Sequence, residues 1–165
     1  MAITKLTADS ITSGAIANTP AFEAYSTGLQ NITNATYTKM EMATEVYDTD
    51  GDYDNSTNYR FTPSVAGKYF CYAKGQSDGA TYENEEFIAM KFYKNNSAVS
   101  HTVSEVQTGG NSGTDGSTAT THTISSIIEF NGTTDYLEVF FLLNTWSDTN
   151  ARVKNKLFGA YRIIE

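Results

Sequence analysis

The stretch of sequence that decides the fold is YDNSTNYRFTPSVAGKYF, residues 53–70. It contains a polar turn, a short strand that ends at Pro63, and an aromatic-rich strand that follows Gly67. Proline fixes φ and has no N–H to donate to a sheet, so Pro63 marks the end of the first strand. Glycine accepts a positive φ, which suits a corner just before the second strand. Two strands joined by a rigid corner predict a β-sandwich that folds over itself.

Alternating apolar residues extend this prediction to the rest of the chain. Residues 86–93 place Ile88, Met90 and Phe92 on one face of a strand, and residues 121–130 and 156–164 alternate in the same way. The run at 136–143 is almost continuously apolar, as expected for a strand that is covered on both faces. No segment carries a capped helical stripe. The sequence therefore predicts an all-β protein made of two antiparallel sheets.

Composition excludes several classes of function. The chain has 165 residues, enough for one domain that buries about 70% of its extended-chain surface. Its 19 acidic and 11 basic side chains give a net charge of −8, which opposes binding to nucleic acid and to anionic membranes. No apolar run reaches the length of about 18 residues that a membrane span needs. The beginning of the chain lacks a signal-peptide core, so we expect folding in a cytosol.

The single cysteine, Cys71, excludes an internal disulfide. It lies in the apolar run Tyr-Phe-Cys-Tyr-Ala at 69–73, which predicts a buried and unreactive thiol.

Five segments, taken in order, resemble the globular head of complement C1q, a branch of the tumour-necrosis-factor-like jelly rolls. They are PAFEA at 20–24, the corner at 53–70, FYKNN at 92–96, FNGTTDYLEV at 130–139 and FGAYRI at 158–163. Two departures from the family pattern are Asn96, where glycine is usual, and a longer turn after Phe130. The resemblance covers residues 19–165.

This resemblance implies a jelly roll of about ten strands that assembles as a tight homotrimer and does binding or scaffolding work, not catalysis. It also implies that the opening and closing strands lie near the threefold seam. On that basis the predicted trimer interface contains Phe22, Tyr25, Phe158 and Tyr161. The alternative is that these rings fill the interior of the sandwich.

Residues 1–18 differ from the rest and form a separate predicted segment. Their large aliphatic side chains are sparse: Ile3, Leu6, Ile11 and Ile16. The last three recur every five residues, a spacing that fits neither a helix nor a strand. The segment resembles the leaders of tailed-phage virion proteins, which open with similar Met-Ala-Ile-Thr-Lys text. We expect an extended arm whose spaced aliphatic side chains anchor the head to another protein. A disordered tail is the alternative.

A loop without apolar residues at 107–117 is the candidate ligand contact. Within it, Thr108, Asn111, Thr114 and Asp115 offer hydroxyl, amide and carboxylate groups to a glycan or receptor. Polar loops of this kind also occur without any function, so the alternative of an idle surface loop stays open.

Metal and catalytic sites are not predicted. The acidic run DTDGDYD at 48–54 suggests calcium, but its glycine and its twelfth position do not match an EF-hand loop. The two histidines, His101 and His122, lack metal-ligand spacing, and no nucleophile motif is present. We expect no cofactor.

Two functions follow from these expectations. The first is a trimeric structural protein on the virion surface of a tailed bacteriophage, assembled in the host cytoplasm. It would be a capsid decoration or cement protein, or a short tail appendage, held by its arms to a capsid or tail protein. The second is a tail-fibre knob that binds a host glycan or receptor. Fold alone does not decide between them.

Overall fold

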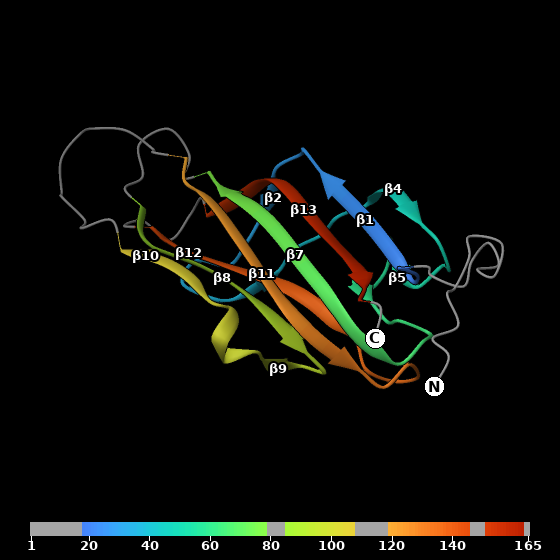
Figure 1. Ribbon diagram of the computed structural model, residues 1–165. Helices are drawn as coiled ribbons and strands as arrows, with labels where there is room; N and C mark the ends of the chain where they lie inside the picture. The colour runs from blue at the N-terminus through green and yellow to red at the C-terminus, as the bar shows by residue number, and fades with distance from the viewer. Residues whose placement is uncertain (1–17, 79–84, 108–118, 146–150, 164–165) are drawn as a thin grey trace, which may run out of the picture.

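A computed structural model describes residues 18–78, 85–107, 119–145 and 151–163. These residues form thirteen strands and one short 3-10 turn at Ser100–Thr102, without an α-helix in the described ranges. Within those ranges, accordingly, no helix is long and apolar enough to cross a membrane. Figure 1 shows the strands stacked in two layers, which we call sheet I and sheet II. The predicted all-β jelly-roll fold is confirmed.

Sheet I contains the first and the last strand of the chain. Its order is β11 (Thr121–Phe130), β7 (Gly67–Ser77), β13 (Arg152–Arg162), β1 (Ala21–Ser26) and β4 (Thr44–Asp48), with β2 (Gln30–Asn31) beside β13. Every neighbouring pair is antiparallel. Because β1 pairs with β13, the two ends of the described chain lie side by side in the sheet.

Sheet II contains the strands between them. Its order is β10 (Ser104–Gln107), β8 (Glu85–Lys94), β12 (Leu137–Thr145), β6 (Arg60–Phe61) and β5 (Tyr53–Asp54), with β3 (Thr38–Lys39) beside β12 and β9 (Ser97–Ala98) beside β8. The predicted strands at 86–93, 121–130 and 136–143 are all present.

Aromatic rings fill the space between the sheets. Phe22 from β1 stacks on Tyr53 and Phe61 of sheet II, with ring centroids 4.6 and 4.5 Å apart, and meets Phe158 edge-on at 4.9 Å. Such contacts add to the free energy gained by removing the rings from water. Cys71 lies in the same core as a free, fully buried thiol whose pKa is raised by burial, as predicted.

The corner at 61–67 has the conformation that its sequence predicts. Strand β6 ends at Phe61, and Pro63 follows as a buried residue. Gly67 has a φ of +146° where β7 begins. The hydroxyl of Tyr69 donates a hydrogen bond of 2.7 Å to the carbonyl oxygen of Val65, which fixes the corner to the new strand.

The departure from the family pattern at Asn96 is accommodated locally. Asn95 and Asn96 both have positive φ, +51° and +63°, in the turn between β8 and β9. Asparagine tolerates this left-handed conformation better than most residues, so it can stand where glycine is usual. The side chain of Asn95 also holds the neighbouring loop, donating to Asp135 at 2.7 Å and accepting from the N–H of Tyr136 at 2.9 Å.

Candidate interaction surface

The outer face of sheet I carries rows of side chains that the strand pairing brings into line. Residues directly opposite each other in an antiparallel sheet point to the same face. One row runs across the sheet through Ala21, Tyr161, Phe70 and Ile127.

The next row on the same face runs through Tyr47, Glu23, Gly159, Tyr72 and Ser125. These two rows make one half of the face aromatic.

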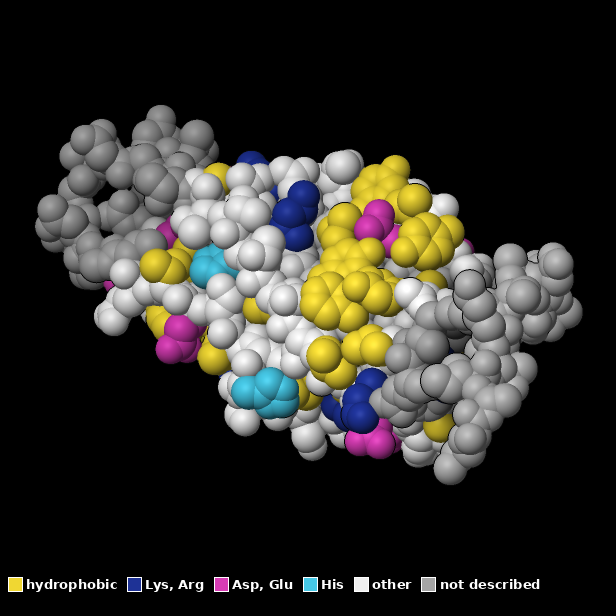
Figure 2. Space-filling model, viewed as in Figure 1, with side chains coloured by type: hydrophobic (Ala, Val, Ile, Leu, Met, Phe, Trp, Pro, Cys, Tyr) yellow, Lys and Arg dark blue, Asp and Glu magenta, His cyan; other side chains and the backbone are white. Residues whose placement is uncertain are grey.

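We call the large apolar side chains of these two rows, together with Tyr25 on the same face of β1, the outer-face patch. It consists of Tyr25, Tyr47, Phe70, Tyr72, Ile127 and Tyr161. Ile127 is 56% exposed, and Tyr25 and Tyr161 are each 37% exposed, although all three are large hydrophobic side chains. In Figure 2 hydrophobic side chains gather on this side of the molecule, while the side toward β10 is mostly polar and uncharged. An exposed apolar cluster of this kind is typical of a protein–protein contact surface.

Contacts inside the patch hold its rings in fixed positions. Phe70 lies between Tyr161 and Tyr72, with ring centroids 5.5 and 6.1 Å away. The hydroxyl of Tyr72 donates a hydrogen bond of 2.7 Å to Glu23 Oε2. Burial raises the pKa of Tyr72, and the hydrogen bond to Glu23 raises it further, so this hydroxyl stays protonated. The patch is therefore an ordered surface before any partner binds.

Glycine makes this arrangement of rings possible. Gly159 lies in β13 between Glu23 on β1 and Tyr72 on β7. A Cβ on residue 159 would be only 2.4 Å from Cζ of Tyr72. The absence of a side chain at residue 159 therefore lets the Tyr72 ring lie across β13 and reach Glu23.

The structure corrects half of the predicted trimer interface. Phe22 and Phe158 have no exposed surface and belong to the core between the sheets, so they fill the sandwich. Their side chains point inward because each lies one residue out of phase with the outward-facing set on its strand. Tyr25 and Tyr161 point outward into the patch, where the role assigned to them stays a prediction.

Sequence reasoning missed the other members of the patch. Phe70 and Tyr72 alternate with Tyr69 and Cys71, so the run at 69–73 is apolar on both faces of one strand. An apolar residue on each face of a strand indicates that both faces are covered. That signal was present in the sequence, but the contribution of Tyr47 depended on the pairing of β4 with β1.

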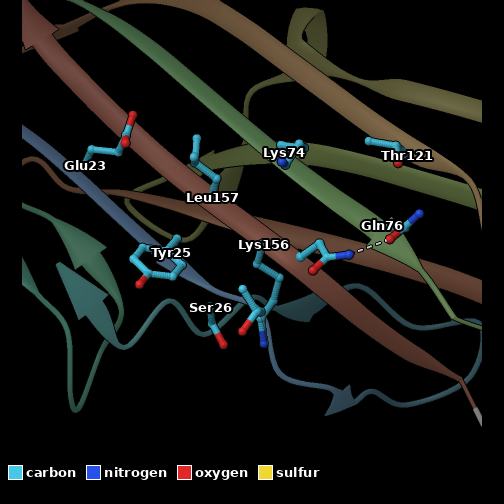
Figure 3. Close-up of a pocket in the computed structure, with 10 residues that line it drawn as sticks. Glu23, Tyr25, Ser26, Lys74, Gln76, Thr121, Lys156 and Leu157 are labelled. Atoms are coloured by element: carbon cyan, nitrogen blue, oxygen red, sulfur yellow. Dashed lines mark hydrogen bonds between the residues drawn. The ribbon is translucent and has the colours of Figure 1, made fainter. Parts of the chain in front are cut away.

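Beside the patch, the same face of sheet I has a hollow of about 360 Å³. It is formed where β13 bulges between Lys154 and Leu157, with Asn155 at a positive φ of +48°. A bulge of this type bends the strand and redirects its side chains. Figure 3 shows the side chains around this hollow rising from β1, β7, β13 and the start of β11.

The charged side chains around the hollow differ in whether they already have a hydrogen-bond partner. Lys156 is buried, with its pKa lowered by burial, and its Nζ donates to Gln30 Oε1 at 3.0 Å. Glu23 already accepts the hydroxyl of Tyr72. The side-chain ammonium group of Lys74 has no hydrogen bond or ion pair to any described residue. Its ammonium group is thus the one cation on this rim available to a ligand within the described ranges.

The acidic run at 48–54 is used to build loops. Asp48 accepts the backbone N–H groups of Gly51 and Tyr53 at 3.0 and 2.8 Å, and Asp52 accepts the N–H of Ser64 at 2.8 Å. Asp54 accepts three consecutive N–H groups at 56–58, which lower the pKa of its carboxyl. Carboxylates aimed at backbone donors fix the turns that Asp and Gly were expected to form.

Two histidines lie within hydrogen-bonding distance of serine hydroxyls, at separate places. His101 Nε2 is 3.3 Å from Ser126 Oγ, and His122 Nδ1 is 3.1 Å from Ser104 Oγ. Neither imidazole has a hydrogen bond to a carboxylate in the described part of the chain. Likewise, no group of three or more metal-ligating His, Cys, Asp or Glu side chains is found among the residues that the structure describes.

The remaining predicted residues lie outside the described ranges. They are Ile3, Leu6, Ile11 and Ile16 of the arm, and Thr108, Asn111, Thr114 and Asp115 of the candidate ligand loop.

Comparison with known proteins finds solved structures with a similar fold. No family model and no curated protein matches the sequence. Among solved structures, the globular domain of zebrafish complement 1qA is similar over 88% of this chain and 98% of its own, with 15% identity and a TM-score of 0.50. Murine APRIL is similar over 87% and 98%, with 7% identity and a TM-score of 0.58. Eiger TNF from S. frugiperda is similar over 88% and 92%, with 10% identity and a TM-score of 0.53.

These likenesses confirm the C1q and TNF type of jelly-roll fold that the head resembles. The resemblance of residues 1–18 to phage leaders stays a prediction.

Proposed function

We propose that this chain is a non-enzymatic structural protein of a tailed-phage virion, whose jelly-roll heads associate as a homotrimer through the outer face of sheet I. The observation that carries the trimer is the outer-face patch, an ordered aromatic surface on the sheet that contains both β1 and β13. The sequence resemblance implies a threefold seam near the opening and closing strands, and two members of the patch, Tyr25 and Tyr161, lie on those strands.

Burial of the patch supplies the driving force for association. Each square ångström of apolar surface removed from water contributes about 25 cal/mol. The rings of Phe70 and Tyr72 are already held in place by their neighbours, so they lose little side-chain entropy on association. In a closed trimer each copy contacts the next through the same heterologous interface, and the third copy contacts the first. The patch is then covered on every copy.

The arms at residues 1–18 connect this trimer to the particle. Three arms on one trimer bind together, so weak individual contacts add up to a high avidity. In this proposal the arms hold the head to a capsid protein, and the trimer acts as a surface decoration or cement. The sequence resemblance of the leader to virion proteins supports the particle as the site of action.

Light scattering coupled to size-exclusion chromatography tests the assembly. We expect a particle of three times the 18.1 kDa chain mass. Deletion of residues 1–18 should leave this trimer intact and abolish incorporation into particles produced in the host. A monomer or dimer in solution would contradict the trimer, whereas full incorporation of the deletion variant would contradict the arm.

A glycan- or receptor-binding knob of a tail appendage is the second candidate function. The specific observation that favours it is the hollow beside the patch, where Lys74 carries an unengaged positive charge.

A further inference from the structure

We infer that the hollow on the outer face of sheet I binds a sugar residue that carries one carboxylate, such as a hexuronic acid unit of a glycan. The inference deepens the second candidate function and rests on it, and it does not depend on the arm. It competes with burial of Tyr25 in a trimer seam, because Tyr25 belongs both to the outer-face patch and to the wall of the hollow.

The size of the hollow suits a sugar. Its volume of about 360 Å³ lies at the lower end of the range of about 300–1,000 Å³ that is typical of small-molecule sites. A second hollow of about 280 Å³ adjoins it and shares Lys74 and Leu157 on its rim. Lys74 thus lies on the rim of both hollows, and the second hollow offers room for a further ring of an oligosaccharide.

The lining combines the groups that recognise a pyranose ring. Tyr25 and Leu157, opposite each other on β1 and β13, supply an apolar wall for the C–H face of the sugar. Polar groups face them, as Figure 3 shows for Gln76, which accepts a hydrogen bond of 2.7 Å from Asn155 Nδ2. That bond leaves the other amide atoms of the pair to donate to and accept from hydroxyl groups.

The charges of the hollow select a monoanion. The ammonium group of Lys74 has no partner among the described residues. It can therefore donate a charge-assisted hydrogen bond to the carboxylate of a ligand. Glu23 on the opposite rim would repel the second charge of a phosphate but can accept a sugar hydroxyl. A neutral sugar would leave the Lys74 charge unused. One carboxylate together with several hydroxyls satisfies both rims.

Backbone geometry keeps the hollow open. Asn155 has a positive φ at the bulge of β13, where a β-branched side chain would be strained. The neighbouring Lys156 is directed away into its hydrogen bond with Gln30, so its long side chain does not fill the space. The depression therefore exists before a ligand arrives.

Nuclear magnetic resonance titration of the full chain with D-glucuronate and D-galacturonate tests the inference, with D-glucose and D-galactose as their neutral counterparts. We expect chemical-shift changes at residues around the hollow with the acidic sugars and much weaker changes with the neutral ones. The variant Lys74→Ala should weaken binding by about tenfold, the effect of one charge-assisted hydrogen bond. Asn155→Gly keeps the positive φ without strain and should also weaken binding.

Lys91→Ala is the matched control, because it removes the same charge from sheet II, where Lys91 lies over the ring of Tyr37 at 4.0 Å. It should leave binding unchanged. The inference is overturned if acidic sugars cause no shifts, if neutral sugars bind equally well, or if Lys74→Ala retains full affinity. Light scattering on the same samples reports the assembly state separately, so a failure of the trimer is distinguishable from a failure of the sugar site.

Discussion

Gly159 and Tyr72 are in a contact that only glycine permits, since a Cβ at residue 159 would approach Cζ of the tyrosine ring to 2.4 Å. The ring therefore crosses β13 and its hydroxyl reaches Glu23 on the strand beyond. Three strands of sheet I are thereby connected on their outer face as well as by their backbone ladders. The same contact sets the shape of the outer-face patch.

Gly159→Ala should weaken self-association more than folding. The clashing atoms belong to the far end of a side chain, so the Tyr72 ring can swing away while the backbone of β13 stays in place. The displaced ring loses its hydrogen bond to Glu23 and distorts the patch. Sedimentation velocity over a range of protein concentrations should show a raised trimer dissociation constant, with a melting temperature close to that of the parent. An unchanged dissociation constant would separate this contact from assembly.

Tyr161→Ala and Phe158→Ala distinguish the two faces of β13. Tyr161 points into the patch, whereas Phe158 is fully buried in the core. Truncation of a buried phenylalanine costs about 3–5 kcal/mol of unfolding free energy, so Phe158→Ala should act on folding. Tyr161→Ala should act mainly on the oligomeric state. Chemical unfolding and light scattering measure the two effects, and an intact trimer with a lowered melting temperature for Tyr161→Ala would place this ring outside the seam.

Gly132→Ala and Gly51→Ala form a matched pair of variants, because both place alanine at the same positive φ. Both glycines have a φ of +72°, but a Cβ at residue 132 would lie 2.3 Å from the backbone N of Ala66, while one at residue 51 meets nothing within 4 Å. Gly51→Ala should cost about 1 kcal/mol, the strain of a positive φ. Gly132→Ala should cost several times more, because the loop after β11 must separate from the corner at 61–67. Equal losses in urea unfolding would show that the packing against Ala66 is unimportant.

His122 makes stability depend on pH. Its imidazole is buried on the inner face of β11, and burial lowers its pKa from the ordinary value of 6.5. Below pH 6.5 the unfolded chain takes up a proton that the folded chain resists, so the unfolding free energy should fall as the pH drops toward the folded-state pKa. Urea unfolding between pH 7.5 and 5.5 should show this slope, and His122→Gln should reduce it. His101→Gln is the control at an exposed histidine, and an equal slope in both variants would refute the assignment.

Local sequence determined the strands, the turns and the direction in which most side chains point. The alternation in 121–130 placed Ile124, Ile128 and Phe130 in the core, and Pro63 with Gly67 placed the corner, because these effects act through the backbone of a few consecutive residues.

The tertiary structure decided which strands became neighbours, and with them the surface. Nothing in the sequence alone shows that Tyr47 joins the patch, since that depends on the register between β4 and β1. Nor does it show which face of β1 meets the core, so Phe22 and Tyr25 were predicted to lie together although they point to opposite sides. Pairing between strands distant in the chain sets both outcomes, because a shift of one residue in register reverses every side chain.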